Sequence, residues 1–183
     1  MARFQRQRIR FQRQPPGTAI TRTVLVVGGG LAATAAWLVV ARDPRPAALS
    51  AGASGLLLLV GGHRANHGAG GPTDRILDEL LDRAWDAAVL GSVAWAVRGP
   101  RPLVAAGALV ALCLSFLSAY VRARGAALAY SVEESHVTRG LRYALVTAGL
   151  AFGWLGWTVW VSAGVAGLAV FVRTAQVASE ERG

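Results

Sequence analysis

Long apolar blocks separated by short charged segments constrain the fold of this 183-residue chain more than any other feature of its sequence. Apolar residues make up 54% of the chain, which is only modestly above the share found in soluble domains. They are gathered, however, in blocks that approach the roughly 20 residues needed for a membrane-spanning helix. The sequence therefore predicts an all-α integral membrane protein.

Six apolar segments can be drawn, at residues 23–41, 47–62, 76–97 and 103–121, with the fifth and sixth sharing residues 143–172. We expect a bend near residues 153–156 to separate the last two, although a single tilted helix would leave five spans. We predict a six-transmembrane-helix bundle over residues 23–174, followed by a short cytoplasmic tail at 175–183. In the basic segment 1–22, Phe4, Ile9 and Phe11 alternate with arginines, so this segment is either an amphipathic surface segment or a plain basic tail.

The charge distribution predicts the orientation in the membrane. All 19 basic residues are arginines, and with the N-terminus inside, fourteen lie on the inner side and four on the outer side. This bias predicts a protein of the inner, cytoplasmic membrane with both termini cytoplasmic. Trp37, Trp95, Trp157 and Trp160 suit interfacial positions, or are packed within the bundle. The arginines lie between apolar blocks and form no basic recognition helix, so we expect no nucleic-acid partner.

An acidic stripe is the most informative local pattern. Asp74, Asp78, Asp82 and Asp86 recur every fourth residue, which places them along one side of a helix. Ionised groups in a spanning helix cost about 2.5–3.5 kcal/mol each, so they normally face a cavity, a partner or an ion. Asp78 and Asp82 on adjacent turns can hold Mg²⁺ or Mn²⁺. Alternatively, Asp74 and Glu79 lie at the interface and Arg83 pairs with one of the other carboxylates.

The stripe resembles part of the signature of the CDP-alcohol phosphatidyltransferases, D-x-x-D-G-x-x-A-R, eight residues, then G-x-x-x-D-x-x-x-D. With Asp78 and Asp82 on its last two aspartates, an ungapped count places Gly61 on the family glycine. Residues 77–90 are similar to the family's third helix, especially in the phosphatidylinositol phosphate synthase branch. Residues 118–128 resemble the block S-Y-V-R-A-R-A-E-A-L, and Arg139 and Arg142 resemble the paired arginines of the fifth helix.

The resemblance implies a homodimeric enzyme of phospholipid biosynthesis in the membrane lipid. Such an enzyme transfers a phosphatidyl group from CDP-diacylglycerol to a polar alcohol and releases CMP, with Mg²⁺ or Mn²⁺ as cofactor. By resemblance Asp78 and Asp82 are metal ligands, with Asp74 as a further candidate, and Asp82 is also the catalytic base. The implied substrate-binding residues are Gly61, Arg122, Arg124, Arg139 and Arg142.

The signature is degenerate, however. Leu57 and Val60 stand where the family has its first two aspartates, and Asp74 replaces the later glycine. Losing two of four carboxylates removes charge that balances two divalent ions and a pyrophosphate. Two alternatives to an active transferase therefore remain open. One is a catalytically impaired relative that acts as a binding or partner subunit, and the other is a small transporter that uses the stripe for ions.

Overall fold

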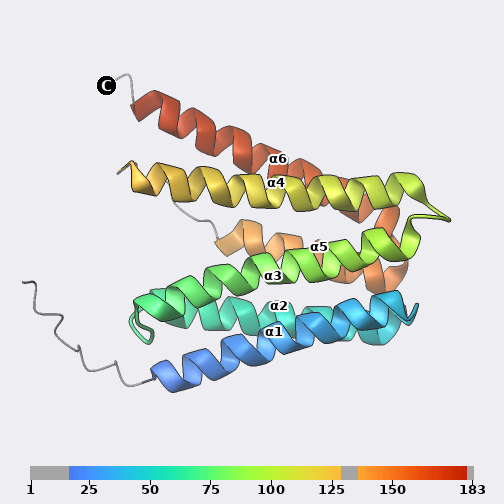
Figure 1. Ribbon diagram of the computed structural model, residues 1–183, viewed down its shortest axis with the longest axis horizontal. Coiled ribbons are helices and arrows are strands. Elements are labelled where there is room, and N and C mark those ends of the chain that lie inside the picture. The colour runs from blue at the N-terminus through green and yellow to red at the C-terminus, as the bar shows by residue number, and fades with distance from the viewer. Residues whose placement is uncertain (1–16, 129–135, 181–183) are drawn as a thin grey trace, which may run out of the picture.

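The computed structural model describes residues 17–128 and 136–180, and these residues form six helices and no strand (Figure 1). The helices are α1 (Thr18–Val40), α2 (Pro44–Asn66), α3 (Pro72–Val97), α4 (Pro102–Ala127), α5 (His136–Phe152) and α6 (Leu155–Glu180). Most of the predicted basic segment, residues 1–16, lies outside the described residues. The predicted boundaries at residues 23 and 174 fall inside α1 and α6.

Proline and glycine account for most of the helix boundaries. Pro44, Pro72 and Pro102 open α2, α3 and α4, where a missing backbone N–H costs nothing and the fixed φ suits the first helical turn. Gly153 adopts a φ of +72°, which glycine reaches without strain, and it separates α5 from α6. The bend expected near residues 153–156 is therefore a break between two helices, and the alternative of one tilted helix is wrong.

Four helices are long and apolar enough to cross a membrane: α1, α2, α4 and residues 155–176 of α6. The acidic stripe makes α3 too polar for this group, and α5 has only 17 residues, two of them arginines. These properties agree with a helical membrane protein. The count of six spans stays a prediction.

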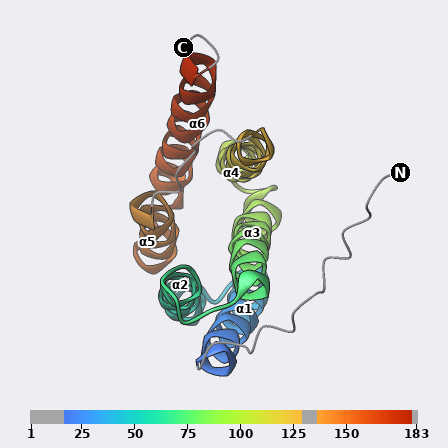
Figure 2. The ribbon, with the colours of Figure 1, turned by 90° about the vertical axis from the view of Figure 1, so that its left-hand side faces the viewer.

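The six helices form a ring when they are viewed along the bundle (Figure 2). Packing runs around it in the order α1, α2, α5, α6, α4, α3, with α3 also in contact with α2. Leu25, Leu58, Trp85, Val89 and Val146 are among the fully buried side chains of the core. Over their described lengths α3 and α5 do not pack backbone against backbone, so only side chains connect them across the ring.

Candidate functional site

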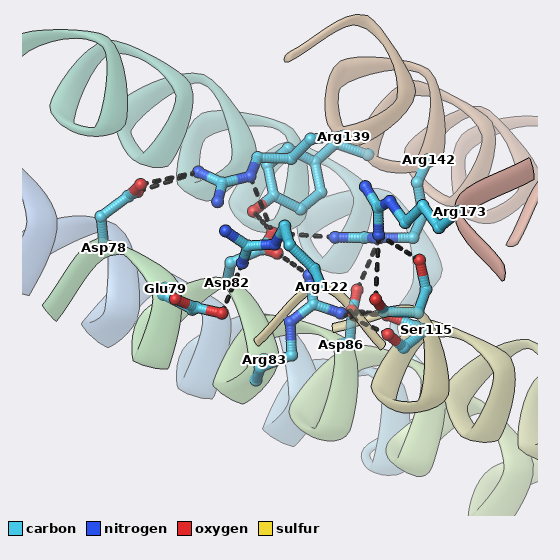
Figure 3. Close-up of polar contacts among 12 residues, drawn as sticks. Asp78, Glu79, Asp82, Arg83, Asp86, Ser115, Arg122, Arg139, Arg142 and Arg173 are labelled. Carbon is cyan, nitrogen blue, oxygen red and sulfur yellow. Dashed lines mark hydrogen bonds and ion pairs between the residues drawn. The ribbon is translucent and has the colours of Figure 1, made fainter. Parts of the chain in front are cut away.

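The acidic stripe points into this ring. The side chains of Asp74, Asp82 and Asp86 are fully buried, and Asp78 is 3% exposed. The expectation that these groups face the protein interior is therefore confirmed. Their partners are guanidinium groups from α1, α3 and α5. Figure 3 shows those of Asp78, Asp82 and Asp86.

Asp78 pairs with Arg139 from the first turn of α5. The Arg139 Nη1 atom donates to Asp78 Oδ1 at 2.9 Å and to Oδ2 at 3.1 Å, and both side chains are buried. The same guanidinium lies 3.4 Å from Asp82 through its Nε atom. Arg139 therefore connects two turns of the stripe to α5.

Asp82 lies at the centre of the network. Its Oδ1 atom accepts hydrogen bonds from Arg142 at 2.8 Å and from the Tyr143 hydroxyl at 2.5 Å, and its Oδ2 atom contacts Arg83 of the same helix. The Tyr143 ring also packs on Trp85, with the ring centroids 4.4 Å apart. Residues of α3 and α5 thus contact both oxygens of this carboxylate.

Asp86 completes the network toward α4. Its Oδ1 atom lies 2.7 Å from Arg142 Nε, and its Oδ2 atom lies 3.2 Å from Arg83 Nη1 and accepts from Ser115. The alternative in which Arg83 pairs with neighbouring carboxylates is therefore confirmed. Three buried carboxylates, Asp78, Asp82 and Asp86, meet three guanidinium groups, so the network formed by these six side chains has no net formal charge.

The remaining predicted residues lie around this network. Asp74 accepts hydrogen bonds from Arg22 of α1 at 2.6 Å and from the backbone N–H of Gly71 at 2.7 Å, and thus ties α3 to α1. Arg122 of α4 pairs with Glu79. Arg124 is exposed in the last turn of α4 and makes no contact with the described aspartates.

The α2 side of the site offers no carboxylate, since α2 contains no acidic residue. Leu57 packs against Gly28 of α1, and Val60 is 53% exposed on the outside of the bundle. Gly61 is packed against α1 as well, because a Cβ atom there would lie 2.6 Å from Leu25 Cδ2. The structure therefore does not bring Gly61 to the aspartates.

The next residue, Gly62, lies against the aspartates where Gly61 does not. A Cβ atom at Gly62 would lie 2.6 Å from Asp78 Oδ1, so only a glycine lets α2 approach the stripe this closely. The backbone of α2 therefore packs directly against the Asp78 carboxylate. Aspartates at positions 57 and 60 would not face Asp78, because these two side chains point toward α1 and outward.

The residues present do not fit a divalent metal. Mg²⁺ and Ca²⁺ bind oxygen ligands at about 2.0–2.6 Å, and a bound ion needs several such ligands with spare negative charge. Here guanidinium nitrogens already lie 2.7–3.4 Å from the oxygens of Asp78, Asp82 and Asp86. Within residues 17–128 and 136–180, no group of three or more His, Cys, Asp or Glu residues is arranged to hold a metal ion.

A small polar cavity lies beside the network, between α3, α4, α5 and α6. Its walls include Arg83, Arg139, Arg142, Arg173 and Ser118, and Arg173 donates to the Ser118 carbonyl at 3.1 Å. Its volume is about 30 Å³, which is enough for one or two water molecules and too small for a phosphate group. Anion binding here therefore requires the helices or the arginines to move.

Sequence reasoning identified the stripe and both α5 arginines but missed several partners. Arg22, Ser115, Tyr143 and Arg173 carry no motif, and they reach the site only because the ring closes around it. Gly62 had one available signal, its place beside Gly61 in a glycine pair. A linear count cannot decide between two such neighbours.

Comparisons with known proteins support the fold. No protein-family model and no curated protein sequence matches the chain. Among solved structures, it is similar to phosphatidylinositol phosphate synthase of Mycobacterium tuberculosis in its apo form. The TM-score is 0.70 at 22% identity, over 87% of this chain and 95% of that one. The crystal structure of the same enzyme with manganese and citrate gives a TM-score of 0.65 at 20% identity, over 88% of each chain.

These similarities extend over nearly the whole chain and concern the arrangement of its helices. The resemblance is therefore confirmed at the level of the fold: this chain has the fold of the CDP-alcohol phosphatidyltransferases, in the form seen in phosphatidylinositol phosphate synthase.

Proposed function

We propose that this chain is a catalytically impaired relative of the CDP-alcohol phosphatidyltransferases, which acts in phospholipid biosynthesis as a membrane-embedded binding or partner subunit. One observation carries the proposal. The aspartates that would hold metal in an active transferase are neutralised by Arg83, Arg139 and Arg142, and α2 supplies no further carboxylate.

The chemistry of phosphatidyl transfer explains why this matters. By the family resemblance, two divalent ions orient the pyrophosphate, and a carboxylate accepts the proton of the attacking hydroxyl. In this chain Asp82 already accepts hydrogen bonds from Arg142 and Tyr143. A carboxylate held in this way is a poor base for a further group, because most of its lone pairs are occupied and its negative charge is compensated.

The network has a clear alternative role as a connection between helices. It joins α3 to α5, whose backbones do not pack directly against each other, and Ser115 extends it to α4. Buried charges without partners are strongly destabilising, whereas complete pairs fix one arrangement of the elements that carry them. This supports a structural role for the network, which maintains the fold, and not a catalytic role.

A second candidate is an active transferase, in which metal and substrate displace the arginines from the aspartates. The observation that favours it is the convergence of Asp78, Asp82, Arg139 and Arg142, all predicted site residues, in one place. In this case the guanidinium groups would move from carboxylate to substrate phosphate, which they also bind in bidentate fashion.

An assay of CMP release distinguishes the two candidates. Purified protein in mixed micelles receives labelled CDP-diacylglycerol, Mg²⁺ or Mn²⁺, and a panel of polar alcohols, with the M. tuberculosis synthase as positive control. We expect no CMP release above background from the wild-type chain. Release that is lost in Asp82→Asn and kept in the surface control Asp43→Asn would establish the transferase and overturn the proposal.

A further inference from the structure

One end of the bundle combines exposed tryptophans, a strained arginine and an apolar cavity. It is the end at which α1 joins α2, α3 joins α4 and α5 joins α6, on the right in Figure 1. Trp37, Trp95, Trp154, Trp157 and Trp160 lie here, within about two turns of these connections, and are 46–81% exposed. We call this part of the molecule the tryptophan end.

Exposed tryptophans gathered at one level mark the boundary between lipid tails and headgroups, because the indole ring is apolar with one polar N–H group. The sixth tryptophan, Trp85, is buried in the core and takes no part. The tryptophan end therefore lies at the headgroup level of one membrane leaflet. It is opposite the end where α1 begins and α6 finishes.

A cavity of about 270 Å³ opens at this level. Side chains of α1, α3, α5 and α6 form almost entirely apolar walls. The connections add Arg42 and Pro100 at the rim, and the start of α2 adds Pro44. The wall residues are Val39, Val93, Ala96, Val97, Leu150 and Leu155. A cavity of this character at the membrane boundary is suited to part of a hydrocarbon chain.

Arg42 at the rim has a strained backbone. Its φ is +63°, and it is the one non-glycine residue with positive φ in the described part of the chain. Arg42 follows the end of α1 in a Schellman motif. The Arg42 N–H donates to the Val39 carbonyl at 3.1 Å, and the Asp43 N–H donates to the Leu38 carbonyl at 3.0 Å. Glycine normally occupies this position. An arginine there indicates that its side chain has a role that outweighs the backbone strain.

The Arg42 side chain is available for a ligand. None of the described residues forms a hydrogen bond or an ion pair with its guanidinium. By contrast, Arg98 at the same end stacks on Trp95 at 3.6 Å and donates to the Trp95 carbonyl. Arg45 and Arg101 add positive charge to these connections, where Asp43 is the single acidic residue. The rim is therefore complementary to a negatively charged headgroup.

We propose that the tryptophan end binds an anionic phospholipid of the adjacent leaflet, with an acyl chain in the apolar cavity and the phosphate on Arg42. This site shares no residue with the acidic stripe, lies toward the end of α3 where the stripe has finished, and does not depend on the function proposed for the stripe. The cavity selects the hydrocarbon chain, the tryptophans set the depth of the lipid, and Arg42 selects the negative charge.

Photo-crosslinking in phosphatidylcholine nanodiscs tests this site. The probe is phosphatidylglycerol with a diazirine in one acyl chain, and the matched neutral probe is phosphatidylcholine with the same chain. In the wild-type protein we expect phosphatidylglycerol to label the cavity walls, in segments 93–97 and 150–155, several-fold more than phosphatidylcholine does. Equal labelling by the two probes, or labelling spread evenly over the lipid-facing helices, would overturn the proposal.

Arg42→Gly separates binding from folding, because glycine is the residue that the backbone at position 42 prefers. We expect this variant to be at least as thermally stable as the wild type and to lose the preference for phosphatidylglycerol. Arg124→Ala removes an exposed arginine at the opposite end of the bundle and should keep the preference. If Arg42→Gly labels like the wild type, Arg42 does not select the lipid and the proposal is wrong.

Filling the cavity provides an independent variant. Ala96 is a half-buried wall residue, and Ala96→Leu adds bulk to the cavity without changing the charge of the rim. Labelling of segments 93–97 and 150–155 should fall for both probes. The remaining labelling should still be stronger with phosphatidylglycerol than with phosphatidylcholine, because Arg42 is unchanged. Undiminished labelling of these segments would show that the acyl chain does not enter the cavity.

Discussion

At the scale of single residues, the pairing of buried charges determines how stable the candidate site is and whether its carboxylates can bind anything else. Taking an isolated charge out of water costs several kcal/mol, and the cost is offset only when a partner of opposite charge lies in good geometry. Asp78 meets this condition through two contacts with Arg139, at 2.9 and 3.1 Å. The pairing decides both the stability of the stripe and its availability to other ligands.

Removing one partner of this pair should therefore be costly. We expect Arg139→Met to lower the free energy of unfolding by about 3–5 kcal/mol, because it removes both hydrogen bonds that this guanidinium makes to the buried Asp78 carboxylate. The double variant with Asp78→Asn should recover part of this loss, since it also removes the buried negative charge. Thermal unfolding in detergent, followed by circular dichroism, measures both effects. Arg124→Ala, on the exposed end of α4, is the control and should change little; equal losses in the single and double variants would contradict the pairing.

The same pairing predicts the response to metal. A ligand present at 100 times its dissociation constant stabilises a protein by about 2.7 kcal/mol. We expect millimolar Mn²⁺ to leave the unfolding temperature of this chain unchanged. The M. tuberculosis synthase, which was crystallised with manganese, serves as the comparison. A saturable rise that disappears in Asp78→Asn would show that Mn²⁺ displaces Arg139, and would favour the transferase.

At the scale of helices, close approach between α2 and α3 determines what covers the stripe. Gly62 places backbone, and no side chain, against Asp78. We expect Gly62→Ala to destabilise the protein by about 1–3 kcal/mol, because the added methyl group displaces the Asp78 carboxylate from Arg139. Gly30→Ala is the matched control in α1, where a Cβ atom meets nothing within 4 Å. It should instead stabilise by about 0.5–1 kcal/mol through helix propensity. Unfolding measurements on both variants check the opposite signs.

The helical scale also separates what the sequence predicts from what it does not. The four-residue spacing of Asp74, Asp78, Asp82 and Asp86 suffices to place them on one face, because it depends only on the geometry of a single helix. Gly61 and Gly62 differ by about 100° around α2, and only the packing of α1 and α3 on either side distinguishes them. Pairs such as Asp82 with Tyr143 join residues that lie far apart in the sequence, and no local pattern specifies them.

At the scale of the whole molecule, the ring arrangement makes the membrane topology testable. α1 begins and α6 ends on the same side of the bundle, while the tryptophans gather on the other side. The helices α3 and α5 are less apolar or shorter than the four candidate spans, but both run alongside these spans within the same ring. If the ring as a whole lies in the bilayer, α3 and α5 cross it too, and their charges face the interior of the ring instead of lipid.

Cysteine labelling tests the predicted six spans. In a Cys113→Ala background, cysteines replace the exposed residues Thr73 and Ala178 at one end, and Gly99 and Trp154 at the other. We expect a membrane-impermeant maleimide to label Thr73→Cys and Ala178→Cys only in inside-out vesicles, and Gly99→Cys and Trp154→Cys only in right-side-out vesicles. The arginine bias predicts this orientation, because arginines flanking the spans are retained on the cytoplasmic side. If Thr73→Cys and Gly99→Cys are labelled from the same side, α3 does not cross the membrane. In that case α3 would lie on the membrane surface. Its 26-residue length and its packing along α1 and α4 argue against this arrangement.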